Sequence, residues 1–172
     1  MFDVLNRAEQ ALPGLLQSPE GWNSLDVAYE PPRVERLWRP FEGDYRLYLH
    51  RIHPCEKALY HPHPWPSVIK IVAGGYEMGV GFGAGDQPPP IAATLKLAPG
   101  SSYEMTHKDG WHYVLPTVES LSVMITGAPW DRWSPGPGQD VKLGPLSEAA
   151  VTNLISAFRV VYLSLCSPSK KP

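Results

Sequence analysis

All six histidines of the chain lie between residues 50 and 112. Two of them, His61 and His63, are separated by a single proline. Residues two apart on an extended strand point to the same face, so the two imidazole rings can approach one ion. Imidazole nitrogen is a common ligand of zinc, iron, nickel and copper. The spacing therefore predicts two ligands of a metal site that needs at least one more.

Prolines follow His61, His63 and Trp65. A residue before proline is pushed out of the helical region toward extended conformations, which helps to aim the two histidines. Because proline cannot donate to a sheet ladder, we expect this segment at an edge, a bulge or the lip of a sheet. The alternative is a polyproline II stretch, a possible docking motif, in which three residues per turn would direct the histidines apart.

A second segment with two histidines, His107 to His112, lies at an expected turn between two strands. It belongs to a longer segment, Gly100 to His112, which resembles the second motif of the cupin superfamily: a glycine, a turn and a metal-binding histidine, with one extra residue here. The segment from His61 to Gly74 resembles the first cupin motif, His-x-His, three or four residues, Glu, six residues and Gly.

The resemblance covers about residues 47 to 126 and implies three ligands, His61, His63 and His112. Ser67 occupies the position at which the family has a carboxylate ligand. A site of three histidines is similar to that of the cysteine dioxygenase branch, where a mononuclear Fe(II) keeps positions open for substrate and oxygen. His107 is an alternative fourth ligand, which would give a more closed shell suited to zinc or nickel as well as iron.

The function that this resemblance implies is a mononuclear Fe(II)-dependent dioxygenase acting on a small organic molecule. Cupins host many reactions, so two other classes stay open. One is a module that binds a small ligand without catalysis. The other is a redox-silent isomerase or lyase, which would use zinc, nickel or manganese.

Residues near the expected ligands are candidates for the remaining roles. Trp65, Trp111 and Ser67 are candidates for a substrate pocket, with the Trp130 loop excluding water, although core packing explains the tryptophans equally well. Groups that could orient a ligand histidine or act as a base are Glu77, Glu104, Tyr103 and Asp109.

Two further sets of residues have a structural explanation that we favour. His50 and His53 are three apart on a strand-like run and therefore point to opposite faces, so only one of them can point inward. An inward-pointing histidine would support the metal ligands or carry a proton and would not bind the metal itself. The alternating glycines from Gly79 to Gly85 resemble a phosphate loop, but no helix pattern follows them. We interpret them as space for a ligand, as close packing of another chain or as simple bending of the strand, and we favour packing.

The elements that must position the histidines are mainly strands. Short runs rich in Val, Ile, Tyr and Leu, broken by Gly, Pro and Asp, extend over residues 33–126. Apolar residues at three- and four-residue steps predict helices over residues 2–12, ending at Pro13, and over residues 147–165, with Ser147 as the N-cap. We expect nine strands, over residues 34–38, 45–52, 58–63, 67–73, 76–82, 94–97, 101–106, 111–115 and 121–126. This pattern, with the resemblance, predicts an all-β fold: an antiparallel cupin-type β-barrel, or jelly roll, with a short helix at each end.

Length and composition set the outer bounds. A chain of 172 residues fits one domain, residues 1–172, and a net charge of -2 does not favour a nucleic-acid partner. No run of 18 or more apolar residues predicts a membrane helix, and charged residues near the start disfavour a signal peptide. Two distant cysteines indicate no disulfide framework, so we expect a cytoplasmic protein with a small-molecule substrate. The resemblance also implies a possible homodimer.

Overall fold

The computed structural model describes residues 1–131 and 143–164. Along the chain, one helix precedes ten strands and a second helix follows them. The helices are α1 (Phe2–Leu15) and α2 (Glu148–Ser164). The strands are β1 (Asn23–Val27), β2 (Val34–Phe41), β3 (Tyr45–Ile52), β4 (His61–Pro62), β5 (Ser67–Ala73), β6 (Tyr76–Phe82), β7 (Ala93–Leu97), β8 (Ser102–Met105), β9 (Gly110–Leu115) and β10 (Ser120–Thr126).

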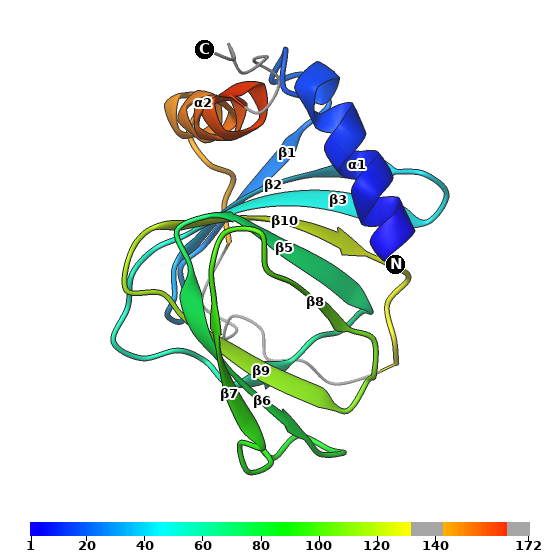
Figure 1. Cartoon of the computed structure of the whole chain (residues 1–172), viewed down its shortest axis with the longest axis vertical. Helices are drawn as coiled ribbons and strands as arrows, with labels where there is room; N and C mark the ends of the chain where they lie inside the picture. Colours follow the sequence, from blue (N-terminus) through cyan, green and yellow to red (C-terminus); the bar gives the residue numbers. More distant parts are fainter. Residues whose placement is uncertain (132–142, 165–172) are drawn as a thin grey trace, which may run out of the picture.

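The strands form two antiparallel sheets that face each other (Figure 1). The first has the order β1-β2-β3-β10-β5-β8 and the second the order β4-β9-β6-β7. Within the described residues no ladder joins one sheet to the other, so the sheets do not close into a barrel. The prediction of an all-β antiparallel fold is confirmed, whereas the closed barrel is corrected to a cupin-type β-sandwich. Turn signals locate the strands in a sequence, but they do not show whether the outer strands pair with one another.

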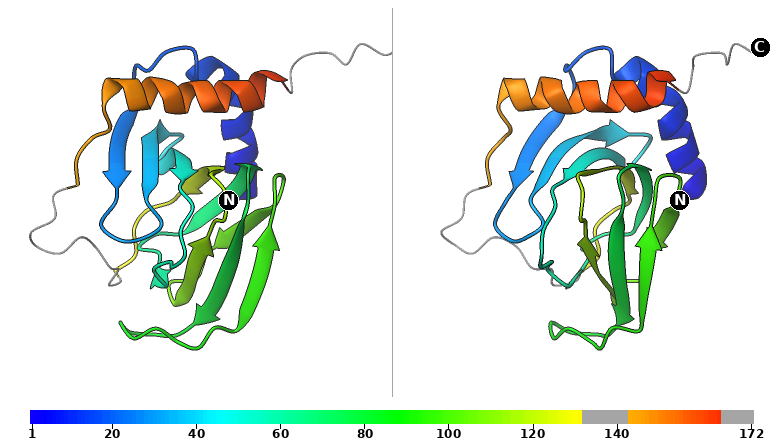
Figure 2. Two further views of the ribbon diagram at one scale, coloured as in Figure 1. Left: turned by 90° about the vertical axis from the view of Figure 1, so that its left-hand side faces the viewer. Right: turned by 60° about the vertical axis from the view of Figure 1, so that its left-hand side comes forward.

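The six-stranded sheet is the middle layer of the molecule, because it has a core on each face. Successive side chains of a strand point to opposite faces. On β3, Leu47 and Leu49 are fully buried in the core beneath the helices, whereas Tyr48 and Ile52 belong to the core between the two sheets. Figure 2 shows both helices on the outer side of this sheet, with the four-stranded sheet on the other side.

The two predicted helices are present, with one change of boundary. Ser147 caps α2 through its Oγ, which accepts from the backbone N–H of Ala150 at 3.2 Å. Helix α1 continues through Pro13 to Leu15, beyond the predicted end. Proline lacks an N–H and disfavours a helix interior, but buried Leu12 and Leu16 pack into the core on either side of it. Tertiary packing therefore outweighs the local stop signal. Residue 165, the predicted end of α2, is outside the described residues.

Strand β2 extends three residues beyond its expected end, to Phe41, and two other strands differ more from the expected pattern. Strand β1 was not predicted, because its sequence Asn-Ser-Leu-Asp-Val is short and polar, as is common for an edge strand. The expected strand over residues 58–63 is reduced to the two residues of β4. The prolines that follow His61 and His63 cannot donate to a ladder, which explains the short pairing.

The glycines of β6 make room for aromatic rings of this chain itself. A Cβ at Gly79 would collide with the ring of Tyr113, and one at Gly81 would collide with the hydroxyl of Tyr60. Tyr60 and Tyr113 meet edge to face with ring centroids 6.2 Å apart. This face of the second sheet is thus filled by aromatic side chains, on the side away from the other sheet.

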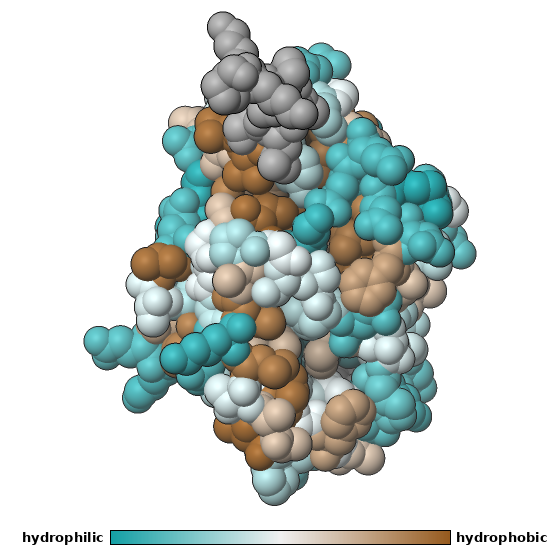
Figure 3. Space-filling view, in the orientation of Figure 1, coloured by the Kyte–Doolittle hydropathy of each residue, from teal (hydrophilic) through white to brown (hydrophobic). Residues whose placement is uncertain are grey.

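The surface mixes polar and apolar residues. In the space-filling view, hydrophilic side chains gather over α1, and smaller hydrophobic areas interrupt them elsewhere (Figure 3). Neither described helix combines the length and apolar character required to cross a membrane.

Candidate metal centre and cavity

Three histidines meet between the two sheets. His61 on β4 is the direct cross-strand partner of His112 on β9, and His63 is the first residue after β4. One nitrogen from each ring lies within 4.8 Å of the others. The ring centroids are 5.0 Å apart for His61 and His112, and 4.4 Å apart for His63 and His112. The histidines of the two motif-like segments therefore converge, as the spacing and the cupin resemblance predict, and the polyproline II alternative with divergent rings is not observed.

Hydrogen bonds fix two of the three rings. His61 Nδ1 donates to the carbonyl oxygen of Leu59 at 2.9 Å. His63 Nδ1 is 2.8 Å from the hydroxyl oxygen of Ser67, which is fully buried. In both rings Nε2 is left to accept a proton or to bind an ion. Ser67, at the position of the family's carboxylate, thus supports a ligand from behind.

The site fits a divalent ion by its own chemistry. Nδ1 of His112 is buried and has no hydrogen-bond partner among the described residues, which is costly for a polar atom unless something else binds it. Burial lowers the pKa of all three histidines, to about 3 for His63, where the proximity of His61 adds to the effect. The rings are therefore neutral near pH 7, which is the protonation state that a metal requires.

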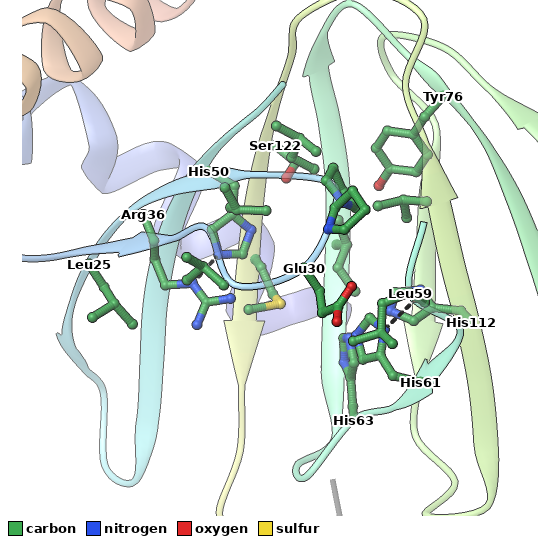
Figure 4. A pocket seen from close by; sticks show the side chains of 18 of the residues that line it. Leu25, Glu30, Arg36, His50, Leu59, His61, His63, Tyr76, His112 and Ser122 are labelled. Carbon is green, nitrogen blue, oxygen red and sulfur yellow. Dashed lines mark hydrogen bonds between the residues drawn. The ribbon is translucent and has the colours of Figure 1, made fainter. Parts of the chain in front are cut away.

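The three rings form part of the wall of a cavity of about 240 Å³. The rest of the wall is largely apolar and comes from the loop before β2 and from both sheets; it includes Leu25, Val27, Pro31, Val34, Ile52, Leu59, Trp65, Ile69 and Met124. Polar exceptions on the opposite side are Arg36, His50 and Ser122, and Figure 4 shows them across the cavity from the three histidines. A small apolar chamber with a few polar groups is typical of a small-molecule site.

The predicted pocket residues occupy three different places. Trp65 is in the cavity wall, stacked on Tyr48 with ring centroids 6.5 Å apart. Ser67 lies behind His63 rather than in the wall. Trp111 is fully buried on the opposite face of β9 from His112, where its Nε1 donates to Gly83 at 2.8 Å. Adjacent residues of a strand face opposite ways, so Trp111 cannot share the cavity with His112.

Of the candidate bases, the structure brings one to the cavity. Tyr103 lies in the wall, its hydroxyl 3.0 Å from that of Tyr76 and its ring 6.2 Å from His112. Burial raises the pKa of both tyrosines, so these hydroxyls stay protonated and can donate a hydrogen bond. Glu77 instead accepts from Tyr113 at 2.9 Å, and Glu104 lies 3.4 Å from the chain's terminal amine.

The remaining histidines lie outside the metal site. His107 is 62% exposed, and its Nδ1 accepts from the backbone N–H of Asp109, so the structure does not bring it to the other three. His53 lies 3.5 Å from buried Glu35. His50 faces the cavity, which agrees with the expectation that His50 and His53 face opposite ways. Of the expected Trp130 loop, Trp130 contacts Pro64 through a backbone hydrogen bond, and the rest lies outside the described residues from residue 132 on.

Arg36 is the main cavity residue that the sequence analysis did not predict. Its position depends on the pairing of β2 with β3, which places Arg36 opposite His50. Arginine on an amphipathic strand is normally read as a surface residue. The available signal is its place in the alternation of β2, where Arg36 shares a face with Val34 and Trp38.

No protein-family model and no curated protein sequence matches the chain. Solved structures are similar to it at low identity. KdgF from Halomonas sp. has 15% identity over 64% of this chain and 89% of its own, with a TM-score of 0.47. An RmlC-like cupin from Shewanella frigidimarina has 15% identity over 65% and 87%, with a TM-score of 0.47. Hydroxypropylphosphonic acid epoxidase from S. wedmorenis has 14% identity over 65% and 58%, with a TM-score of 0.47. The two motifs, the antiparallel sandwich and the convergence of its three histidines between the sheets agree with the resemblance: the chain has a cupin-type fold.

Proposed function

We propose that this protein is a metal-dependent enzyme, and most concretely a mononuclear Fe(II) dioxygenase acting on a small organic molecule. The observation that carries the proposal is the convergence of three imidazoles at the wall of a largely apolar cavity. Three protein ligands would leave part of a metal's coordination shell open, and the three histidines line a chamber of substrate size.

The surrounding residues have distinct tasks in this proposal. His61, His63 and His112 would hold the ion, while Leu59 and Ser67 fix the orientation of two of the rings. An Fe(II) ion bound there would supply dioxygen activation, and a redox-silent ion would supply Lewis acidity. Tyr103 and Tyr76 would present a hydroxyl donor beside His112. The apolar wall, including Trp65, would keep bulk water from the reacting molecule.

Metal content is the first test. We expect protein purified without an affinity tag to carry close to one equivalent of a divalent metal by elemental analysis. The double variant His61→Ala, His63→Ala should lose it. A matched control, His53→Ala with His107→Ala, also removes two histidines but should retain the metal. Equal metal content in the two double variants would overturn the proposed site.

The reaction is tested on protein loaded with Fe(II) under anaerobic conditions. Oxygen uptake that depends on an added organic substrate, and that is absent from the His61→Ala, His63→Ala variant, is the expected result. Conversion of a substrate with zinc, nickel or manganese and without oxygen uptake would instead assign a redox-silent enzyme. Binding of small ligands without any conversion would assign a non-enzymatic module.

A further inference from the structure

Three aromatic residues are the chain neighbours of histidines in the metal site. Tyr60 precedes His61, while Trp111 and Tyr113 stand on either side of His112. Adjacent residues of a strand face opposite ways, so these three rings lie on the outer face of the four-stranded sheet, away from the cavity. Each ring is therefore one residue from a metal-site histidine, on the other side of the sheet.

The rings of Tyr60, Trp111 and Tyr113 form one cluster, which we call the outer aromatic cluster. The ring centroid of Tyr60 lies 5.6 Å from that of Trp111 and 6.2 Å from that of Tyr113. Such separations are typical of interacting aromatic pairs. On β6, a Cβ at Gly79 would collide with the Tyr113 ring, and one at Gly81 with the Tyr60 hydroxyl. The two glycines thus let the rings lie directly on the strand.

Tyr113 has an acceptor for its proton. Its hydroxyl donates to Glu77 Oε1 at 2.9 Å, and both side chains are partly exposed. A phenol gives up an electron readily only when its proton leaves at the same time, because the oxidised phenol is a strong acid. A carboxylate at hydrogen-bond distance can take that proton. The buried hydroxyl of Tyr60 has no hydrogen-bond partner among the described residues. Within the cluster, Tyr113 is therefore the tyrosine that is easier to oxidise.

The aromatic rings between the two sheets have the opposite electrostatic environment. The guanidinium carbon of Arg36 lies 5.4 Å from the centre of the Tyr48 ring, and that of Arg46 lies 5.3 Å from the centre of the Trp38 ring. A cation beside a ring opposes the removal of an electron from it, because the oxidised ring is itself positive. Tyr48 and Trp38 are therefore poor electron donors, whereas Tyr113 has a carboxylate beside it.

The tyrosine beside the metal site also differs from Tyr113. The ring of Tyr103 lies 6.2 Å from that of His112, and its hydroxyl is 3.0 Å from the hydroxyl of Tyr76. A second phenol is a weak base and does not take up the proton of an oxidised tyrosine. Burial also raises the pKa of both hydroxyls, so proton loss is costly there. An electron is supplied more easily from the outer face of the sheet.

We propose that the outer aromatic cluster is an electron relay that protects the three-histidine site when no organic substrate is bound. This inference rests on the proposed function and adds a protective reaction to it. An ion oxidised by dioxygen takes one electron from Trp111, and Trp111 takes one from Tyr113 across the Tyr60 ring. Tyr113 becomes a neutral radical as its proton passes to Glu77.

The relay then returns to its resting state at the surface. A soluble thiol gives a hydrogen atom to the Tyr113 radical and becomes a thiyl radical, while Glu77 releases its proton to water. The net result is that the ion gains one electron and the thiol loses one electron and one proton. The protein chain itself is unchanged.

Transfer within the cluster is tested on metal-free protein, so that this part is independent of the proposed function. Pulse radiolysis in azide solution produces azidyl radicals, which oxidise tryptophan preferentially. We expect the absorption of the tryptophan radical to decay while that of a tyrosyl radical grows, at a rate independent of protein concentration. Tyr113→Phe keeps the ring but not the hydroxyl and should lose most of this growth. Glu77→Gln should slow the growth, because an amide does not take up the proton.

Tyr162 provides the matched control. Its hydroxyl donates to a carboxylate, that of Glu9, at 2.9 Å, but the residue lies in the core beneath the helices, on the other side of the six-stranded sheet. Tyr162→Phe should therefore leave the growth of the tyrosyl absorption unchanged. Circular dichroism checks that each variant is folded. Equal growth in Tyr113→Phe and in the unmodified protein would overturn the relay and leave the cluster a packing feature.

The link to the metal is tested on Fe(II)-loaded protein, mixed with oxygenated buffer without organic substrate and frozen. Electron paramagnetic resonance should show a tyrosyl radical that is lost in Tyr113→Phe, retained in Tyr162→Phe and removed by an added thiol. Absence of this signal from protein that carries iron, or its persistence in Tyr113→Phe, would overturn the relay alone. Protein that retains no iron would overturn the proposed function and the relay together.

Discussion

Ser67 shows how a single substitution can change the role of a motif position. The cupin pattern has a carboxylate there, and the sequence alone indicates only that a ligand is missing. In the structure the shorter hydroxyl reaches His63 Nδ1 at 2.8 Å. The residue thus moves from the set of ligands to the set of groups that orient them, which leaves three neutral donors for the ion.

Removal of that hydroxyl is the prediction at this scale. Ser67→Ala removes the hydrogen-bond partner of His63 Nδ1, so we expect metal affinity to fall by about 10- to 100-fold while the fold is retained. Ser122→Ala is the matched control, because Ser122 is an equally buried serine whose hydroxyl has no partner among the described residues. Competition with a chromophoric chelator measures both affinities. Equal affinities in the two variants would show that Ser67 does not support the site.

The strands carry most of what the sequence could predict. Alternation and turn signals place β3, β5 and β6 at their observed bounds, because each is a continuous run with one buried face at least. Local patterns also place His61 and His63 on one face. They do not reveal that β2 pairs with β3, so the contact between Arg36 and His50 was not predicted. They also cannot distinguish a sandwich from a barrel. What was missed depends on contacts between distant segments.

An ion pair on the outer face of the six-stranded sheet links three elements. Arg51 on β3 pairs with Glu35 on β2 at 2.9 Å and donates to Asn153 on α2 at 2.7 Å. Arg51→Met should lower the free energy of unfolding by about 3 kcal/mol, since it leaves Glu35 buried without its main partner. Arg7→Met, which breaks an exposed pair with Glu42, should leave stability close to that of the unmodified protein. Urea unfolding measures both, and equal losses would contradict the structural role of Arg51.

For the whole molecule, four histidines with lowered pKa values make stability depend on pH. Burial lowers the pKa of His50, His61, His63 and His112 in the folded state. Unfolded histidines take up protons below about pH 6.5, whereas these folded ones stay neutral, so acid favours the unfolded state. The stability of the metal-free protein should be complete above that pH and should decline as pH falls toward the folded value, which is about 3 for His63.

Each histidine that stays neutral contributes a slope of at most about 1.4 kcal/mol per pH unit in this window. Urea unfolding of metal-free protein at pH 7.5, 6.5 and 5.5 measures the combined slope. The variant His61→Gln, His63→Gln should show a shallower decline over the same range. A free energy of unfolding that is constant from pH 7.5 to 5.5 would contradict the buried, neutral state of these rings.

The two-faced middle sheet also has a consequence for how the protein reaches its native state. On β3 the cavity residue His50 lies between Leu49 and Arg51, which both serve the helix-covered side. If β3 paired one residue out of register, each of its side chains would point to the opposite face of the sheet. The imidazole of His50 would then lie in the apolar core beneath the helices. A misaligned chain therefore loses stability twice, because Leu47 and Leu49 leave the core beneath the helices and the imidazole of His50 enters that core without a partner. The correct register of β3 therefore places both the cavity residue His50 and the leucines of the helix-covered core.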